Sequence, residues 1–177
     1  MQISLFDSDY HSVTMAATDP ALKGDVLNAA ARPDVREAVA DLYGAVQREI
    51  DPRRPLCVIS GRCCRFEEYG HRLFVTTMEL ATFVHELHQS SVDRVAQMAE
   101  WDGSGCPFQV NKLCGVHAFR PFGCRMFFCD ATSTQWQNEQ YERFHTELKE
   151  LHKRLDVPYV YVEWREALRE LIGSPTH

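Results

Sequence analysis

The chain has 177 residues, a formal net charge of −6 and 45% hydrophobic residues. This length and composition suffice for one domain with a substantial core, so its thiols are not needed to staple a small unstable fold. The acidic balance argues against nucleic-acid binding, since phosphate contacts require a basic face. No stretch is long and apolar enough to span a bilayer, and the first residues lack the pattern of a signal peptide. We therefore expect a cytoplasmic protein without membrane contacts.

Helical patterns dominate the first third of the chain. After an arm or edge strand over residues 1–17, the Asp-Pro pair at 19–20 predicts a short helix to about Ala30. A second helix begins at Pro33, where apolar residues recur at helical spacing, and we expect it to end at the Asp-Pro pair of residues 51–52.

The middle of the chain alternates short strands and helices. Residues 72–76 are rich in strand formers and predict a short strand. Thr76 and Glu79 have the spacing of a capping box, which predicts a helix start and a helix to about Gln89. A further helix is predicted over residues 91–101, before a glycine-rich turn.

The last third predicts a long amphipathic helix, whose apolar residues run from Trp136 to Leu155 and which we expect to be the longest of the chain. A short strand over residues 158–162 and a helix over 163–172, closed by Gly173, complete the pattern. The fold class predicted is α+β and mainly helical, with helices flanking a loop-rich cysteine core that contains short strands. We expect one domain over residues 1–177: an N-terminal helical region (1–56), a cysteine-cluster metal-binding core (57–130) and a C-terminal helical region (131–177).

All seven cysteines fall in two groups inside that core. Thiols stay reduced in the cytosol, where a clustered, odd-numbered set indicates metal binding or redox chemistry more than disulfides. Thiolates are soft ligands that suit zinc, copper(I) or iron–sulfur clusters. A set of buried structural thiols is the simpler alternative. The candidate metal ligands are Cys57, Cys63, Cys64, Cys106, Cys114, Cys124 and Cys129.

The ordered motifs in this core resemble one known family. They are Cys57-Val-Ile-Ser60-Gly-Arg-Cys63-Cys64, Thr-Thr-Met-Glu79, Cys106-Pro-Phe and Cys114-Gly-Val-His-Ala-Phe-Arg-Pro-Phe-Gly-Cys124-Arg-Met-Phe-Phe-Cys129. Together they resemble the zinc- or iron-chelating proteins named for a CxxCxxCC motif, over roughly residues 55 to 130. Ser60 replaces the second cysteine of that motif. His117 stands where the family often has tyrosine, and adds a candidate nitrogen ligand.

The cysteine spacing favours an iron–sulfur centre over zinc. The gaps between cysteines are longer or shorter than the two to four residues typical of paired zinc ligands. Cys106 is followed by proline, as in bacterial ferredoxins, and nearby arginines and phenylalanines suit an anionic [4Fe–4S] cluster. Zinc remains the alternative cofactor. Cys64, Cys106, Cys114 and Cys124 form the preferred ligand set, followed by Cys63, Cys57 and Cys129. Adjacent cysteines in an extended chain point apart, so Cys63 and Cys64 would share one metal only where the backbone turns.

The function predicted is electron transfer, or redox or metal sensing, by a [4Fe–4S] protein. Such a function would involve a protein partner as well as the cluster. A structural zinc module that shapes an interaction surface is the first alternative. The family resemblance alone implies a second, methyl transfer to a protein lysine as in flagellin lysine methylases, and we find no glycine-rich nucleotide loop to support it. The arginines near the thiols, including Arg120 and Arg125, are expected to hydrogen-bond loop carbonyls around the site more than to bind an anion.

Overall fold

The computed structural model describes residues 21–57 and 60–172. Helices make up most of this part, and its strands form two small antiparallel pairs, so the fold is α+β and mainly helical, as predicted. The α-helices are α1 (Leu22–Ala30), α2 (Pro33–Arg53), α3 (Phe66–Tyr69), α4 (Thr77–Gln89), α5 (Arg94–Glu100), α6 (Phe122–Met126), α7 (Thr134–Arg154) and α8 (Trp164–Ile172). The strands are β1 (Phe74–Thr76), β2 (Gln109–Val110), β3 (Leu113–Cys114) and β4 (Tyr161–Glu163), and the 3₁₀ helices are η1 (Arg62–Cys64), η2 (His117–Phe119) and η3 (Ala131–Ser133).

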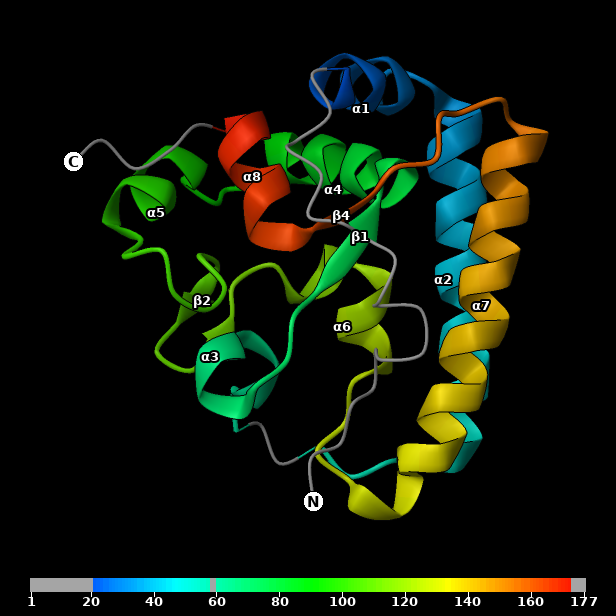
Figure 1. Cartoon of the computed structure of the whole chain (residues 1–177), viewed down its shortest axis with the longest axis vertical. Coiled ribbons are helices and arrows are strands. Elements are labelled where there is room, and N and C mark those ends of the chain that lie inside the picture. Colours follow the sequence, from blue (N-terminus) through cyan, green and yellow to red (C-terminus); the bar gives the residue numbers. More distant parts are fainter. Residues whose placement is uncertain (1–20, 58–59, 173–177) are drawn as a thin grey trace.

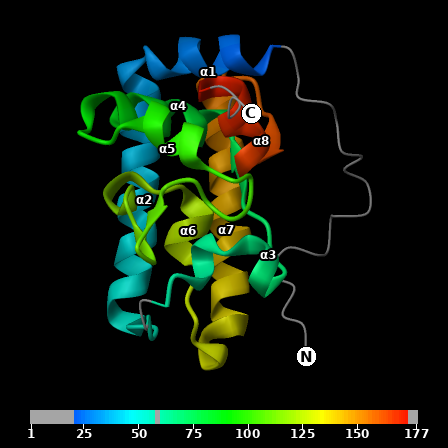
Figure 2. The same cartoon turned by 90° about the vertical axis from the view of Figure 1, so that its left-hand side faces the viewer.

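Two long helices form the frame of the molecule. In both views α2 and α7 lie side by side along the long axis, and α1 crosses one end of them (Figures 1 and 2). Each has 21 residues, so α7 shares its length with α2, and the expectation that it would be the longest helix is wrong. The apolar stripe predicted on α7 forms a core face, since Phe144 and Leu148 are fully buried there. None of the helices within the described ranges is long and apolar enough to cross a membrane.

The β1–β4 pair joins the middle of the chain to its last helix. Phe74 pairs with Glu163 and Thr76 with Tyr161 in antiparallel register. Each strand is followed at once by a helix, α4 after β1 and α8 after β4. Thr76 caps α4 through the predicted capping box with Glu79. The small sheet therefore fixes where two helices start.

The element boundaries differ from the predicted ones in a few places. Helix α2 continues through Pro52, which lacks the amide for an intrahelical hydrogen bond, and ends at Arg53, where Arg54 adopts a left-handed backbone. Helix α5 begins later than predicted, where the Asp93 carboxylate accepts a hydrogen bond from the amide of Ala96. The predicted arm of residues 1–17, the Asp-Pro pair at 19–20 and Gly173 lie outside the described residues.

The packing between α7 and the core gives a direct test of this fold. Leu148→Ala would leave a cavity at a fully buried position, and we expect it to lower the free energy of unfolding by about 2–5 kcal/mol. Leu27→Ala removes the same atoms from a side chain that is 48% exposed on α1, and we expect a change within about 0.5 kcal/mol. Urea unfolding of both variants measures the difference; equal losses would contradict this packing.

Candidate metal centre

Short segments from distant parts of the sequence meet where the cysteines lie. Cys64 ends η1, Cys114 ends β3 and Cys124 lies in α6. The amide of Cys106 donates a hydrogen bond of 2.8 Å to the carbonyl of Cys64. This backbone contact brings the two cysteine groups of the sequence together.

Thiol–thiol interactions define a group of five cysteines, which we call the five-cysteine group: Cys63, Cys64, Cys106, Cys114 and Cys124. Hydrogen bonds with Cys106, Cys114 and Cys63 raise the pKa of the Cys64 thiol far above its usual range. Their own hydrogen bonds with Cys64 lower the pKa of Cys63 to about 7 and the pKa of Cys114 to about 6. Burial raises the pKa of Cys124, and the negative charges of Cys106, Cys63 and Cys114 raise it further. The four preferred ligands are therefore gathered together with Cys63.

The adjacent cysteines face the same side. Residues 62–64 form a 3₁₀ turn, and the Sγ atoms of Cys63 and Cys64 lie 3.9 Å apart. The turn supplies the bend that would let both thiols act at one centre. Gly61 precedes it with a left-handed backbone (φ 69°), and Gln109 Nε2 donates to its carbonyl at 2.9 Å.

The donor set fits a thiolate-bound centre in number and chemistry. Five soft donors interact, one more than a zinc ion or a [4Fe–4S] cluster needs. Within the described part of the chain, however, no three or more His, Cys, Asp or Glu side chains have the arrangement of a metal-ion site. The described thiols therefore interact, but they are not arranged around one common metal-ion position. All seven cysteines are free thiols.

The remaining candidate ligands lie apart from this group. Cys57 is exposed, and the Cys129 Sγ instead contacts Ser60 Oγ at 3.4 Å. His117 is exposed, and its Nε2 accepts a hydrogen bond of 2.6 Å from Arg120. The two departures from the CxxCxxCC pattern, Ser60 and His117, therefore make contacts other than with the five-cysteine group.

Arginines around the thiols bind loop carbonyls, as predicted. Arg125 donates to the carbonyls of Arg120 and Ala118, and its guanidinium lies 4.2 Å from the centre of the Tyr43 ring. Arg120 donates to the carbonyl of His117. Its positive charge favours the ionised form of three thiols, those of Cys63, Cys114 and Cys124. These side chains shape the loops and also supply a positive field beside the sulfurs.

A buried carboxylate holds the segment that carries Cys124. Glu79 accepts hydrogen bonds from the amide and hydroxyl of Thr76 (2.9 and 3.0 Å) and from the amide of Phe122 at the start of α6 (2.9 Å). The capping box was visible in the sequence, but the third bond was not, because Phe122 is 43 residues away. Burial raises the pKa of Glu79 to about 7.

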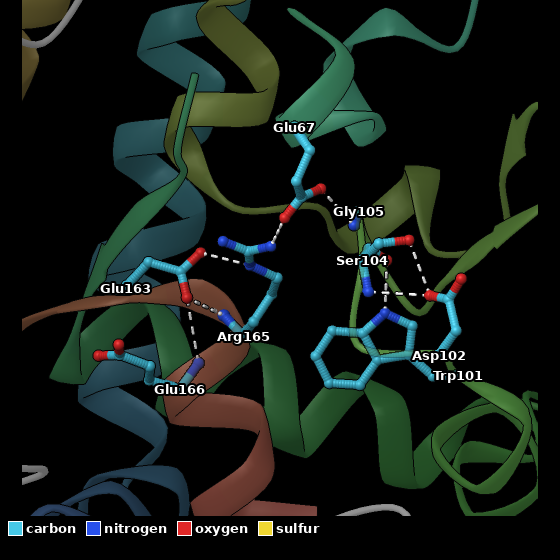
Figure 3. Close-up of polar contacts among 8 residues, drawn as sticks. All are labelled: Glu67, Trp101, Asp102, Ser104, Gly105, Glu163, Arg165 and Glu166. Atoms are coloured by element: carbon cyan, nitrogen blue, oxygen red, sulfur yellow. Dashed lines mark hydrogen bonds and ion pairs between the residues drawn. The ribbon is translucent and has the colours of Figure 1, made fainter. Parts of the chain in front are cut away.

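Another set of polar contacts holds the turn before Cys106 (Figure 3). Glu67 accepts a hydrogen bond from the amide of Gly105 at 2.8 Å and pairs with Arg165, which also pairs with Glu163 at 2.9 Å. Trp101 Nε1 donates to the carbonyl of Ser104 at 2.6 Å. Sequence reasoning missed this network, because no local spacing indicates that Glu67 would meet a residue of the last helix.

A cleft of about 650 Å³ opens beside the five-cysteine group. Two of its wall residues are Cys64 and Cys106, and Glu68, Glu100 and Asp102 lie among the others. The cleft therefore gives solvent a route to the edge of the thiol group, through an acidic opening.

Comparison with family models, with curated proteins and with solved structures finds no match to this chain. The resemblance to the CxxCxxCC proteins stays a prediction that rests on the motifs alone.

The close contact of Gly105 with Cys64 predicts a strong effect of a methyl group there. Gly105 has φ 57°, and a Cβ atom would lie 2.7 Å from the carbonyl oxygen of Cys64. We expect Gly105→Ala to lose about 1–3 kcal/mol more stability than Gly70→Ala, since the clash adds to the left-handed strain. Gly70 is a matched control, with φ 64° and no atom within 4 Å of its added Cβ. Urea unfolding measures both, and similar losses would argue against the backbone contact.

The raised pKa of Glu79 predicts a pH dependence of stability. The usual pKa of 4.5 applies to the unfolded chain and about 7 to the folded one, so the folded state holds the proton more tightly. The contribution of Glu79 to the free energy of unfolding is therefore largest below pH 4.5. It declines by roughly 3 kcal/mol as the pH rises to 7 and above. Glu79→Gln should remove that part of the slope. Unfolding free energies of both proteins at several pH values between 4.5 and 7.5 measure it; parallel curves would contradict the assignment.

Proposed function

We propose that this protein binds a metal centre through cysteine thiolates, and that the centre is a [4Fe–4S] cluster used in electron transfer or redox sensing. The observation that carries the thiolate-bound centre is the five-cysteine group, since scattered core thiols would not interact with one another as Cys64 does with Cys63, Cys106 and Cys114. The choice of a cluster over zinc rests on the cysteine spacing in the sequence. The residues that would hold the cluster are Cys64, Cys106, Cys114 and Cys124, with Cys63 as the fifth donor. When bound, such a cluster would supply one-electron redox chemistry.

The surroundings of the thiols support an anionic centre. Arg120 acts electrostatically on three of the five thiols. Phe108 and Phe122 are fully buried and lie two residues from Cys106 and Cys124 in the sequence, so they supply apolar surroundings to these segments. Positive charge and an apolar wall both favour a cluster whose four thiolates give it net negative charge.

The backbone of the site is held by the chain itself. The Cys106–Cys64 hydrogen bond, the bond from Gln109 to the Gly61 carbonyl and the Glu79 contact to Phe122 each fix one cysteine-bearing segment. A preformed backbone lowers the ordering cost of ligand binding, because fewer residues must be arranged when the centre assembles.

Zinc is the second candidate, and one distance favours it. Four sulfurs at about 2.3 Å from a tetrahedral zinc ion lie about 3.8 Å from each other. The Cys63–Cys64 separation of 3.9 Å matches that spacing. In that case the metal would be structural, and the cysteine core would present an interaction surface to a protein partner.

Metal and sulfide analysis of protein purified without oxygen tests the proposal. We expect about four iron and four acid-labile sulfide per chain, with broad visible absorption. Zinc without sulfide would replace the cluster by the structural-zinc alternative. Absence of iron, zinc and sulfide, also after reconstitution with iron and sulfide, would overturn both.

Paired serine variants test which cysteines bind. Cys114→Ser removes a thiol of the five-cysteine group and should lower the iron content severalfold, whereas Cys57→Ser removes an exposed thiol outside it and should leave the content unchanged. Circular dichroism checks that both variants fold. Equal retention of metal in the two variants would place the centre elsewhere.

A further inference from the structure

A second cavity, of about 320 Å³, lies on another side of the cysteine region. Its walls include Arg62, Tyr69, His71, Phe127, Phe128 and Cys129, and none of the five-cysteine group lines it. The volume falls within the range of small-molecule sites, which begins at about 300 Å³. We call it the aromatic cavity.

Ring systems form much of the cavity wall. The imidazole of His71 stacks on Phe127 with ring centres 5.2 Å apart and meets the edge of Phe66 at 5.3 Å. The ring of His71 lines the cavity and adds one more flat aromatic surface to its wall. Tyr69 and Phe128 add two further rings. Such walls favour a flat aromatic ligand, which stacks on ring faces or meets ring edges.

The acceptors of the cavity are already engaged. Asp130 accepts hydrogen bonds from the amide and hydroxyl of Thr132 (2.9 and 2.6 Å) and from the hydroxyl of Ser133 (2.7 Å). These bonds lower the pKa of Asp130 to about 2. Gln137 accepts from the amide of Phe128 and donates to the carbonyl of Asp130. These bonds use most of the acceptor capacity of Asp130, which stays ionised, while Gln137 keeps a second amide N–H.

The wall also contains a cationic side chain, that of Arg62. The guanidinium groups of Arg62 and Arg65 both lie 4.9 Å from the centre of the Tyr69 ring. Arg65 is paired with Glu68, whereas no ion pair of Arg62 occurs within residues 21–57 and 60–172. Arg62 therefore offers a charged fork of donors beside the rings, and a carboxylate is the group that such a fork binds best.

We propose that the aromatic cavity is a binding site for a small planar aromatic acid, whose ring lies among Tyr69, Phe127 and Phe128 and whose acidic group pairs with Arg62. This ligand site goes beyond the proposed metal centre and does not depend on it. The two are neighbours, because Arg62 precedes Cys63 and the His71 Nε2 lies 3.5 Å from the carbonyl of Cys63.

Three probes separate the ring from the charge: 2-naphthoate has both, 2-naphthylmethylammonium has the ring with a positive charge, and cyclohexanecarboxylate has the acid without an aromatic ring. Calorimetric titration of the purified full chain should give saturable 1:1 binding of 2-naphthoate, at least about tenfold tighter than that of the other two. Binding that is equal for the three probes, or none at millimolar concentration, would overturn the proposal.

Variants then locate the bound acid. Arg62→Gln should weaken 2-naphthoate binding about tenfold, whereas Arg72→Gln, at an exposed arginine outside the cavity, should not change it. Ala131→Trp would fill the cavity from an exposed wall position and abolish binding; Thr134→Phe serves the same purpose if the first variant does not fold. Unchanged binding in Arg62→Gln and in the folded cavity-filling variant would place the ligand elsewhere and refute the site.

Discussion

The carboxylate of Glu79 is the interaction on which the arrangement of the cysteine region depends. It closes the capping box at the start of α4 and, with its other oxygen, holds the first amide of α6, the helix that carries Cys124. A buried carboxylate is expensive unless its oxygens accept hydrogen bonds, and here three donors from two segments satisfy it. Because the donors come from both segments, neither can move without leaving the carboxylate partly unpaired.

The loops of the cysteine region are held by polar contacts of the chain itself. Arg125 binds two carbonyls of the segment between Cys114 and Cys124, and Glu67 binds the amide just before Cys106. Arg165 ties Glu67 to the β4–α8 junction (Figure 3). A loop with few strands of its own needs such bonds, since its backbone groups would otherwise lie buried without partners. The result is a cysteine-bearing scaffold in which the middle of the chain is held to the β4–α8 segment.

The sequence predicted the regular elements well where periodicity or capping is local. The α4 start at Thr76 follows from four consecutive residues, and the buried face of α7 follows from apolar residues at helical spacing. Helix α6 was not predicted, because five residues with a glycine and a cysteine show no periodic pattern. Its first turn exists because Glu79 satisfies the amide of Phe122, a partner that only the fold supplies.

The preferred set Cys64, Cys106, Cys114 and Cys124 follows from spacing and motif, and in the fold these thiols, together with Cys63, influence one another's pKa. Cys63 ranked lower because neighbouring side chains diverge in an extended chain, whereas here η1 turns the backbone. Cys57 is exposed and the Cys129 Sγ contacts Ser60, and which of the seven thiols bind metal stays a prediction. The iron, zinc and sulfide content of the purified protein decides whether these thiols bind a metal, and which one.

The sequence by itself determined the chemical character of this protein. Seven cysteines between residues 57 and 129, arginines near them in the sequence and helices on either side are all properties of residue type and local spacing. Only the tertiary structure decided which thiols meet, that Glu67 and Arg165 support Cys106, and that Arg62 stands beside the rings of the aromatic cavity with no carboxylate partner among the described residues. These contacts join residues far apart in the chain, and no local pattern encodes a pairing that is set by the packing of whole segments.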